Sequence, residues 1–140
     1  MDTEESNRGM DEMDQSSKQL LANLEECAES CQVGLMHSID EGGDFVKMEH
    51  LRWMMDCHEI CRLAINFFIR DSEYAGDILS LCAYICEDCS QSCKKFFNDA
   101  HMLACSEVCD NCAKACRDMI EEECEECEIR TENEKDRSDR

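Results

Sequence analysis

Small and apolar side chains recur along the first part of this chain in alternating steps of four and three residues. The repeating positions are Leu20, Leu24, Cys27, Cys31, Gly34 and Ser38. Such steps keep side chains on one face of an α-helix, and their alternation gives the 3.5-residue repeat of helices that pack together. The pattern therefore predicts a helix from about Ser17 to Asp40 with one face turned toward a core.

Three further segments repeat this pattern, from about Phe45 to Ile69, from about Tyr74 to Phe97, and from about Ala100 through Glu121. Their repeating positions are His50, Met54, Cys57, Cys61, Ala64 and Phe68, then Ala75, Leu79, Cys82, Cys86, Cys89, Cys93 and Phe96, then Met102, Cys105, Cys109, Cys112, Cys116 and Met119. Helices of similar length with short connections predict an all-α fold, an antiparallel up-down-up-down four-helix bundle with a cysteine-lined core.

The connections contain residues that end one helix and begin the next. In the stretch 41–44, glycine suits the left-handed backbone at a helix C-terminus, and Asp44 suits the N-cap of the second helix. Asp71 and Ser72 interrupt the pattern again, and the stretch 98–99 marks the last turn. These signals support the predicted boundaries of the four helices.

The bundle topology brings different side chains to its two ends. The end where the first and third helices finish and the second and fourth begin, which we call the mouth, collects Met36, His37, Met48, His50, Met54, His101 and Met102. The opposite end collects Leu20, Leu24, Ala64, Phe68, Leu79, Met119 and Ile120. We expect that apolar side chains close this second end and that a metal ion enters through the mouth.

Cysteine is the dominant residue of the predicted core. The spacing Cys-x3-Cys-x2-Cys-x3-Cys occurs in residues 82–93 and again in residues 105–116, and the chain has 14 cysteines. Twelve of them fall on inward faces: Cys27, Cys31, Cys57, Cys61, Cys82, Cys86, Cys89, Cys93, Cys105, Cys109, Cys112 and Cys116. Soft thiolates and thioethers select Cu(I), zinc and iron–sulfur clusters. This regular column of thiols predicts a metal-binding core.

Charge favours Cu(I) among these metals. A buried thiolate is costly unless it is neutralised, and one Cu(I) per thiolate leaves the core near neutral. A zinc ion held by four thiolates keeps a charge of about −2, so several such sites in one core would accumulate negative charge. Thiolates four residues apart on a helix, with Cβ atoms roughly 5–6 Å apart, can also bridge a two-coordinate ion without bending the helix.

Composition agrees with the all-α prediction and excludes several function classes. The 140-residue chain has no proline and carries a net charge of −20, so it should repel nucleic acid and anionic membranes. We expect a disordered acidic tail in residues 1–17, the bundle in residues 18–121, and in residues 122–140 a second acidic tail or an extension of the fourth helix. The chain shows no signal sequence and no membrane span, which predicts a cytoplasmic protein.

The cysteine motifs resemble those of the four-helix-bundle copper storage proteins, in the cytosolic branch of that family. The resemblance rests on Cys57-His-Glu-Ile-Cys61 and on the doubled motifs of residues 82–93 and 105–116, and it covers about residues 20–120. It implies storage or detoxification of many Cu(I) ions along the core, His or Met at the open end, and a homo-oligomer, a tetramer. Copper ions are the expected partners, with a copper chaperone or a low-molecular-weight thiol as the donor.

The candidate metal ligands are the twelve core cysteines and, at the mouth, His37, His50, Met54, His101 and Met102. Gly34 and Ser38 stand where further cysteines would continue the stripe of the first helix, and His50 stands where the family often has cysteine. The resemblance therefore implies a lower capacity near the mouth. The pair Cys124 and Cys127 is either a further copper site or incidental, and His58 is expected on the surface.

Three other functions stay open on the sequence alone. A zinc or cadmium buffer would bind about one metal per four thiolates. An iron–sulfur electron carrier would use the same soft ligands, and a purely structural bundle would cross-link its helices by disulfides. No catalytic triad, phosphate-binding loop or glycine-rich fingerprint is present, so we do not expect an enzyme.

Overall fold

The computed structural model describes the backbone of residues 13–138 and the side chains of residues 13–123. This part of the chain forms the helices α2 (Gln15–Glu41), α3 (Met48–Ile69), α4 (Ala75–Lys94) and α5 (Ala100–Ser138), and one short 3-10 helix, η1 (Gly43–Val46). Within the described residues there is no strand. The all-α prediction is confirmed.

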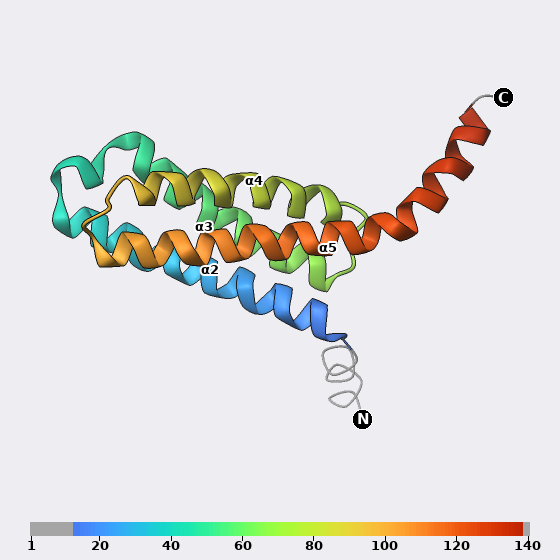
Figure 1. The fold of residues 1–140 in the computed structure, drawn as a ribbon, viewed down its shortest axis with the longest axis horizontal. Helices are drawn as coiled ribbons and strands as arrows, with labels where there is room; N and C mark the ends of the chain where they lie inside the picture. The colour runs from blue at the N-terminus through green and yellow to red at the C-terminus, as the bar shows by residue number, and fades with distance from the viewer. Residues whose placement is uncertain (1–12, 139–140) are drawn as a thin grey trace.

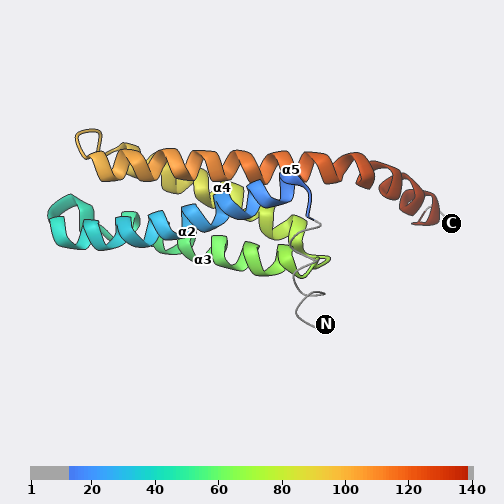
Figure 2. The same cartoon turned by 90° about the horizontal axis from the view of Figure 1, so that it is seen from below.

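The four α-helices form a bundle (Figure 1). Each helix packs against the next along the chain, and α2 also packs against α5. Successive helices run in opposite directions, which is also visible in the view from below (Figure 2). Because each helix has two neighbours, the faces with the cysteine repeats enclose one central column.

The first connection differs from the prediction at the start of the second helix. Gly42 has φ 72° and Gly43 has φ 59°, and the Gly42 amide donates to the Ser38 carbonyl, so glycine ends α2 as expected. Asp44, however, lies inside η1, where it pairs with Lys47, and does not cap α3. Helix α3 begins at Met48, three residues later than predicted, because the intervening turn places the Phe45 ring against the core.

The other two connections follow local hydrogen bonding. Asp71 adopts φ 53° and the Ser72 amide donates to the Phe67 carbonyl, which closes the end of α3. Helix α4 ends at Lys94, before the predicted Phe97, because the following residues form tight turns. The Asp99 carboxylate then accepts a hydrogen bond of 2.9 Å from the Met102 amide and so caps the start of α5.

The two ends of the bundle differ as the sequence predicts. Leu20, Leu24, Leu79 and Met119 are buried at the end where α2 begins. Phe68, Ile78 and Ile120 pack against this cluster. The cysteine column lies between this closed end and the mouth, where α2 and α4 finish. A continuous apolar plug therefore separates one end of the column from solvent.

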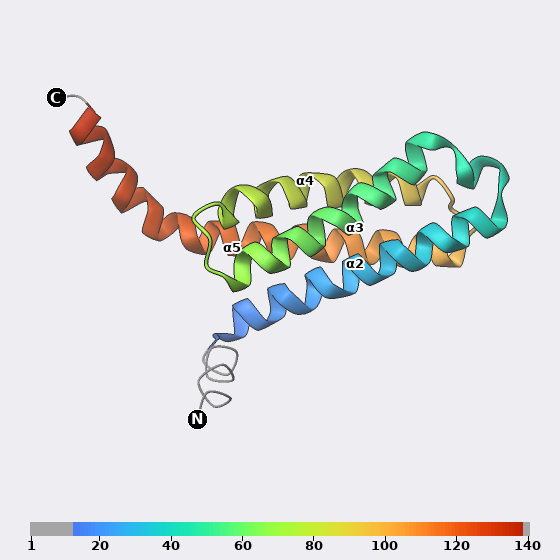
Figure 3. The same cartoon turned by 180° about the vertical axis from the view of Figure 1, so that it is seen from behind.

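Helix α5 continues as helical backbone to Ser138, well past the other three helices (Figures 1 and 3). The side chains of Cys124 and Cys127 lie outside the residues whose side chains are described, so their predicted copper site has no structural description. The proposed division into tails and bundle remains a prediction. In the described part of the chain, no helix combines the length and the apolar character that crossing a bilayer requires.

Candidate metal centre

The central column consists of thiol groups from all four α-helices. Each of the twelve cysteines predicted to face inward is buried and free of disulfide bonds. The alternating steps of four and three residues along each helix account for this placement, because they keep every cysteine on the buried face. Cysteine side chains therefore occupy core positions that leucine occupies in most helical bundles.

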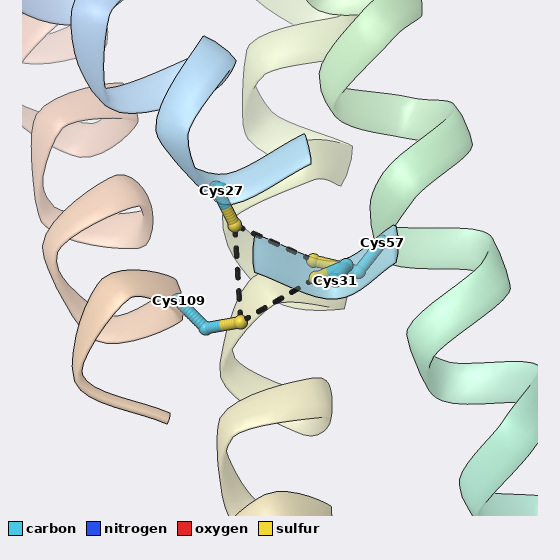
Figure 4. Close-up of side chains that lie close together, drawn as sticks. All are labelled: Cys27, Cys31, Cys57 and Cys109. Atoms are coloured by element: carbon cyan, nitrogen blue, oxygen red, sulfur yellow. Dashed lines mark hydrogen bonds between the residues drawn. The ribbon is translucent and has the colours of Figure 1, made fainter. Parts of the chain in front are cut away.

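The sulfur atoms come into direct contact across helix boundaries. The Sγ atom of Cys27 on α2 lies 3.7 Å from that of Cys57 on α3 and 3.8 Å from that of Cys109 on α5. Cys31, one turn further along α2, lies 3.9 Å from Cys109. Figure 4 shows these four side chains pointing toward one another from three helices. Such convergence is what a metal ion with several thiolate ligands requires.

Among the residues whose side chains are described, three sets of four cysteines each have all four sulfur atoms within 4.8 Å of one another. The sets are Cys27, Cys31, Cys57 and Cys109; Cys27, Cys57, Cys61 and Cys86; and Cys61, Cys82, Cys86 and Cys112. Neighbouring sets share two members. The arrangement is therefore a continuous chain of potential ligands in which four thiolates serve two sets each.

The distances separate metal binding from disulfide formation. Among the described cysteines, the shortest sulfur–sulfur distance given by a hydrogen bond is 3.6 Å, between Cys57 and Cys86, whereas a disulfide joins its sulfurs at about 2.05 Å. A metal bound at about 2.3 Å from four thiolates holds them roughly 3.8 Å apart, and trigonal Cu(I) fits a similar spacing. The column is thus spaced for metal–thiolate bonds.

Hydrogen bonds among the thiols control their ionisation. The pKa of Cys109 is raised well above its usual range by its contacts with Cys105 and other neighbouring thiols and by burial. The pKa of Cys27 shifts the other way, because its contacts with Cys109 and with other neighbouring thiols lower it. Contacts among the thiols therefore shift the pKa values of neighbouring core cysteines in opposite directions, and burial opposes the loss of a proton from each of them.

Four core cysteines lie outside the three sets. Cys89, Cys93, Cys105 and Cys116 are all buried. Cys105 donates a long hydrogen bond of 3.8 Å to the Ser30 carbonyl. Cys93 and Cys105 extend the thiol column toward the mouth, Cys116 extends it toward the closed end, and Cys89 lies beside the thiols of the first set.

The mouth contains a second group of soft ligands just beyond the thiols. His50, Met54 and Met102 are buried there around the Ser38 hydroxyl. Ser38 Oγ lies 3.3 Å from His50 Nε2, 3.7 Å from Met54 Sδ and 3.8 Å from Met102 Sδ. Burial lowers the pKa of His50, with a smaller contribution from Lys95, although Cys89 and Cys105 act in the opposite direction. The imidazole is therefore neutral at pH 7 and able to bind a metal.

The other two predicted histidines lie at the rim of the mouth. His37 is half-buried, and its Nε2 lies 2.8 Å from a carboxylate oxygen of Asp99. His101 is exposed and packs against the His37 ring at 4.3 Å between centroids. Met36 and Met48, also expected near the mouth, are 59% and 61% exposed. The rim thus presents nitrogen and thioether groups to solvent, while the deeper ligands are enclosed.

Comparison with known proteins identifies the arrangement. The sequence model of the family described as "Csp: Copper storage protein" matches residues 13–128. The chain belongs to the copper storage protein family. The match spans the whole thiol column and both of its ends.

Individual proteins with similar sequences or structures support this family match. A cysteine-rich protein from Bacillus subtilis, YhjQ, is 32% identical over 87 residues, which are 62% of this chain and 81% of that protein. The crystal structure of Nmul_A1745 from Nitrosospira multiformis has a TM-score of 0.72 at 33% identity, covering 77% of this chain and 97% of that one. The Cu(I)-bound copper storage protein BsCsp3 gives 0.71 at 30% identity, covering 76% and 99%. Apo-CSP3 from Bacillus subtilis gives 0.67 at 29% identity, covering 74% and 98%.

One prediction about a histidine next to this family motif was wrong. His58 was expected on the surface, but it is half-buried and its Nδ1–H donates a 2.7 Å hydrogen bond to the Ala28 carbonyl on α2. Because His58 directly follows Cys57, its side chain points toward the interface between α2 and α3. An offset of one residue from the buried stripe is therefore close enough for a long polar side chain to reach a neighbouring helix.

The polar partners of the mouth were not predicted from the sequence. Ser92 Oγ lies 2.8 Å from His50 Nδ1, and the Phe96 ring packs 4.7 Å from the same imidazole. Ser38 was predicted to lie on the inward face and was noted as a missing cysteine, but its place among three candidate ligands was not predicted. Its place on the inward stripe was the available signal. Ser92 offered none, because it lies one position off the cysteine stripe of α4.

Proposed function

We propose that this chain stores Cu(I) ions, for storage or detoxification, as a multinuclear cluster along its core. The observation that carries the proposal is the overlap of the three four-cysteine sets, which makes single thiolates available to two metal ions at once. The family match and the likeness to the Cu(I)-bound protein BsCsp3 support the same metal. All twelve core cysteines serve as ligands in this proposal.

Charge supports Cu(I) over zinc in these shared sites. One Cu(I) per thiolate neutralises the buried column, so roughly ten or more ions per chain are expected. Zinc would occupy separate tetrahedral sites with about one ion per four thiolates. The three sets give a specific reason to keep zinc or cadmium buffering as a second candidate. A zinc or cadmium buffer that used only these sets would leave Cys89, Cys93, Cys105 and Cys116 without a role as metal ligands.

Entry through the mouth is the proposed route for the ion. His37 and His101 at the rim make first contact, then His50, Met54 and Met102 pass Cu(I) to the nearest thiols. The buried leucines of the opposite end support a single direction of filling. Each thiol that binds loses its proton, so uptake releases protons and weakens as the pH falls.

Delivery and assembly complete the proposal. A copper chaperone or a low-molecular-weight thiol supplies Cu(I) to the mouth in the cytoplasm, and the chain has no catalytic activity. Exposed apolar side chains on α2, among them Val33, Met36 and Ile39, support self-association as a tetramer. Cys124 and Cys127 would act as an accessory capture pair on the extended part of α5.

The test loads the reduced apo-protein in parallel with excess Cu(I) and with excess Zn(II) under anaerobic conditions. After gel filtration, metal analysis gives the number of ions per chain and the elution volume gives the oligomeric state. The proposal predicts roughly ten or more Cu(I) and about three or fewer Zn(II) per chain. Binding of only one or two Cu(I) would exclude a copper store.

A further inference from the structure

The Ser38 hydroxyl occupies the centre of a ligand set. Ser38 on α2 is fully buried, and its Oγ lies within 3.8 Å of a nitrogen and of two thioether sulfurs. The three groups come from two other helices, His50 and Met54 from α3 and Met102 from α5. One hydroxyl proton can serve only one of these three acceptors at a time. The other two groups keep their lone pairs available for a metal ion and have only a weak contact with the hydroxyl.

A glycine creates the space in which the two methionines converge. A Cβ atom at Gly34 would lie 2.5 Å from Met54 Cε, 3.3 Å from Met102 Cε and 3.6 Å from Cys105 Sγ. The methyl groups of both methionines therefore occupy the place that a side chain at position 34 would take. The Cys105 thiol lies beside the same position. The methionine pair thus lies directly between Ser38 and the thiol column.

Ser92 fixes the orientation of the imidazole. The 2.8 Å contact between His50 Nδ1 and Ser92 Oγ is shorter than the 3.3 Å contact between Nε2 and Ser38. If Nδ1–H donates to Ser92, the Nε2 lone pair faces Ser38 and accepts from its hydroxyl. This is the tautomer that a metal ion at Nε2 needs.

From this geometry we propose that Ser38 is a gate and Ser92 a positioning residue for a transfer site made of His50, Met54 and Met102. The proposal rests on the proposed copper function and adds to it how the mouth opens. The Ser38 hydroxyl closes the site by its hydrogen bond to Nε2. An incoming Cu(I) replaces that hydrogen bond, and the serine side chain rotates away.

The ligand chemistry distinguishes this site from the store beneath it. An imidazole and two thioethers are neutral metal ligands. Cu(I) therefore binds them without releasing a proton, and they supply no negative charge that would neutralise the ion. The thiolates below bind more tightly because they supply negative charge. Copper therefore passes through the transfer site during loading, and the site itself fills last.

The experiment measures the rate and the extent of loading separately. Cu(I) is transferred anaerobically from a chromophoric Cu(I) complex to the reduced protein, and the colour of the free chelator is followed. Ser38→Ala is expected to load about fivefold faster and Ser92→Ala about fivefold slower, each the equivalent of one neutral hydrogen bond. Both should reach the copper content of the wild type to within one ion.

Ser106→Ala is the matched control. Ser106 is equally buried, but its hydroxyl donates to the Leu103 carbonyl in its own helix. It should load at the wild-type rate. If Ser38→Ala proves unstable, Ser38→Cys keeps the size of the side chain and should retain the last Cu(I) against a chelator that removes it from the wild type, because a thiolate would then stand among the three ligands.

The outcomes separate the two proposals. Normal final capacity with an unchanged or slower rate for Ser38→Ala would overturn the gate and leave the copper store intact. An unchanged rate for Ser92→Ala would overturn its positioning role. Uptake of only one or two Cu(I) by the wild type would overturn the storage function and the gate together.

Discussion

The sulfur atoms of Cys57 and Cys86 lie 3.6 Å apart, although 29 residues separate them along the chain. Cys57 belongs to the first and second four-cysteine sets, and Cys86 belongs to the second and third. This pair of residues, on α3 and α4, therefore connects all three sets. It makes the core one extended cluster, in which removal of one thiol affects metal ions on both sides.

Loss of a shared thiol should cost more copper than loss of a terminal one. Cys86→Ser removes a ligand from two sets and should lower the capacity by about two or three Cu(I) per chain. Cys116→Ser is the matched control outside the three sets, and should lower it by about one, the number that one thiolate neutralises. Anaerobic loading and copper analysis measure both. Equal losses would indicate independent sites along the column.

Gly34 should respond to alanine differently from a glycine with open space. Ala in a helix is favoured over Gly by about 1 kcal/mol. Gly76→Ala should gain up to about that amount, because no atom lies within 4 Å of the new Cβ. At Gly34 the new methyl must displace Met54 and Met102, and crowding of about 1–3 kcal/mol offsets or exceeds the gain. Chemical denaturation of both apo variants would show the difference, and an equal gain would refute the crowding.

Asp99 should stabilise the start of α5 in a pH-dependent manner. Burial opposes ionisation of its carboxyl, but hydrogen bonds from His37 and from the Met102 amide outweigh it and lower the pKa of Asp99. Asp99→Ala should therefore lower the free energy of unfolding by about 1 kcal/mol at pH 7. Because the folded-state pKa is depressed, this contribution is present above the unfolded value of about 4 and is lost as the pH falls through the folded value.

Chemical denaturation of the Asp99→Asn variant across pH 2 to 7 tests whether this contribution to the free energy of unfolding is lost in acid. The stability difference from the wild type should shrink in acid. Asp44→Ala is the control, because Asp44 pairs with Lys47 where both side chains are more than 70% exposed. It should change stability by less than about 0.5 kcal/mol at any pH. A difference for Asp99→Asn that persists at pH 2 would contradict the role of its charge.

The apo-protein should fold without metal. Neutral thiols, together with the leucine and methionine plug, give the bundle a dry core that packs like small apolar side chains. Far-UV circular dichroism should therefore show a helical spectrum that changes little on loading. The melting temperature should rise by about 10 °C or more, because metal binds only the folded chain. A random-coil spectrum of the apo-protein would show instead that metal drives folding.

The repeat of buried positions was enough to predict the helices and the cysteine column. Every cysteine between Cys27 and Cys116 lies where its position in the repeat placed it, because period and burial are directly linked in a bundle. The tight turn at Gly42 was also predicted, because glycine suits the left-handed backbone at a helix C-terminus. The start of α3 at Met48 was not predicted. It depends on tertiary packing, because the Phe45 ring stacks on the Phe96 ring at the mouth and so lies outside α3.

The polar network of the mouth could not be read from the sequence. The contacts of Ser92 and Asp99 join residues 42 and 62 positions apart, and each lies off the cysteine repeat. Such contacts depend on how α2, α3, α4 and α5 are rotated against one another. Periodicity fixes the buried face of a helix but not which of its flanking polar side chains meet across the end of the bundle.

The measurement that tests the central claim most directly is anaerobic titration of the reduced apo-protein with Cu(I), in the presence of a chromophoric Cu(I) chelator. If the column is a copper store, the chelator stays metal-free until roughly ten or more equivalents have been added, near one per core thiolate. If the chelator takes up copper after one or two equivalents, the twelve core cysteines do not form a copper store.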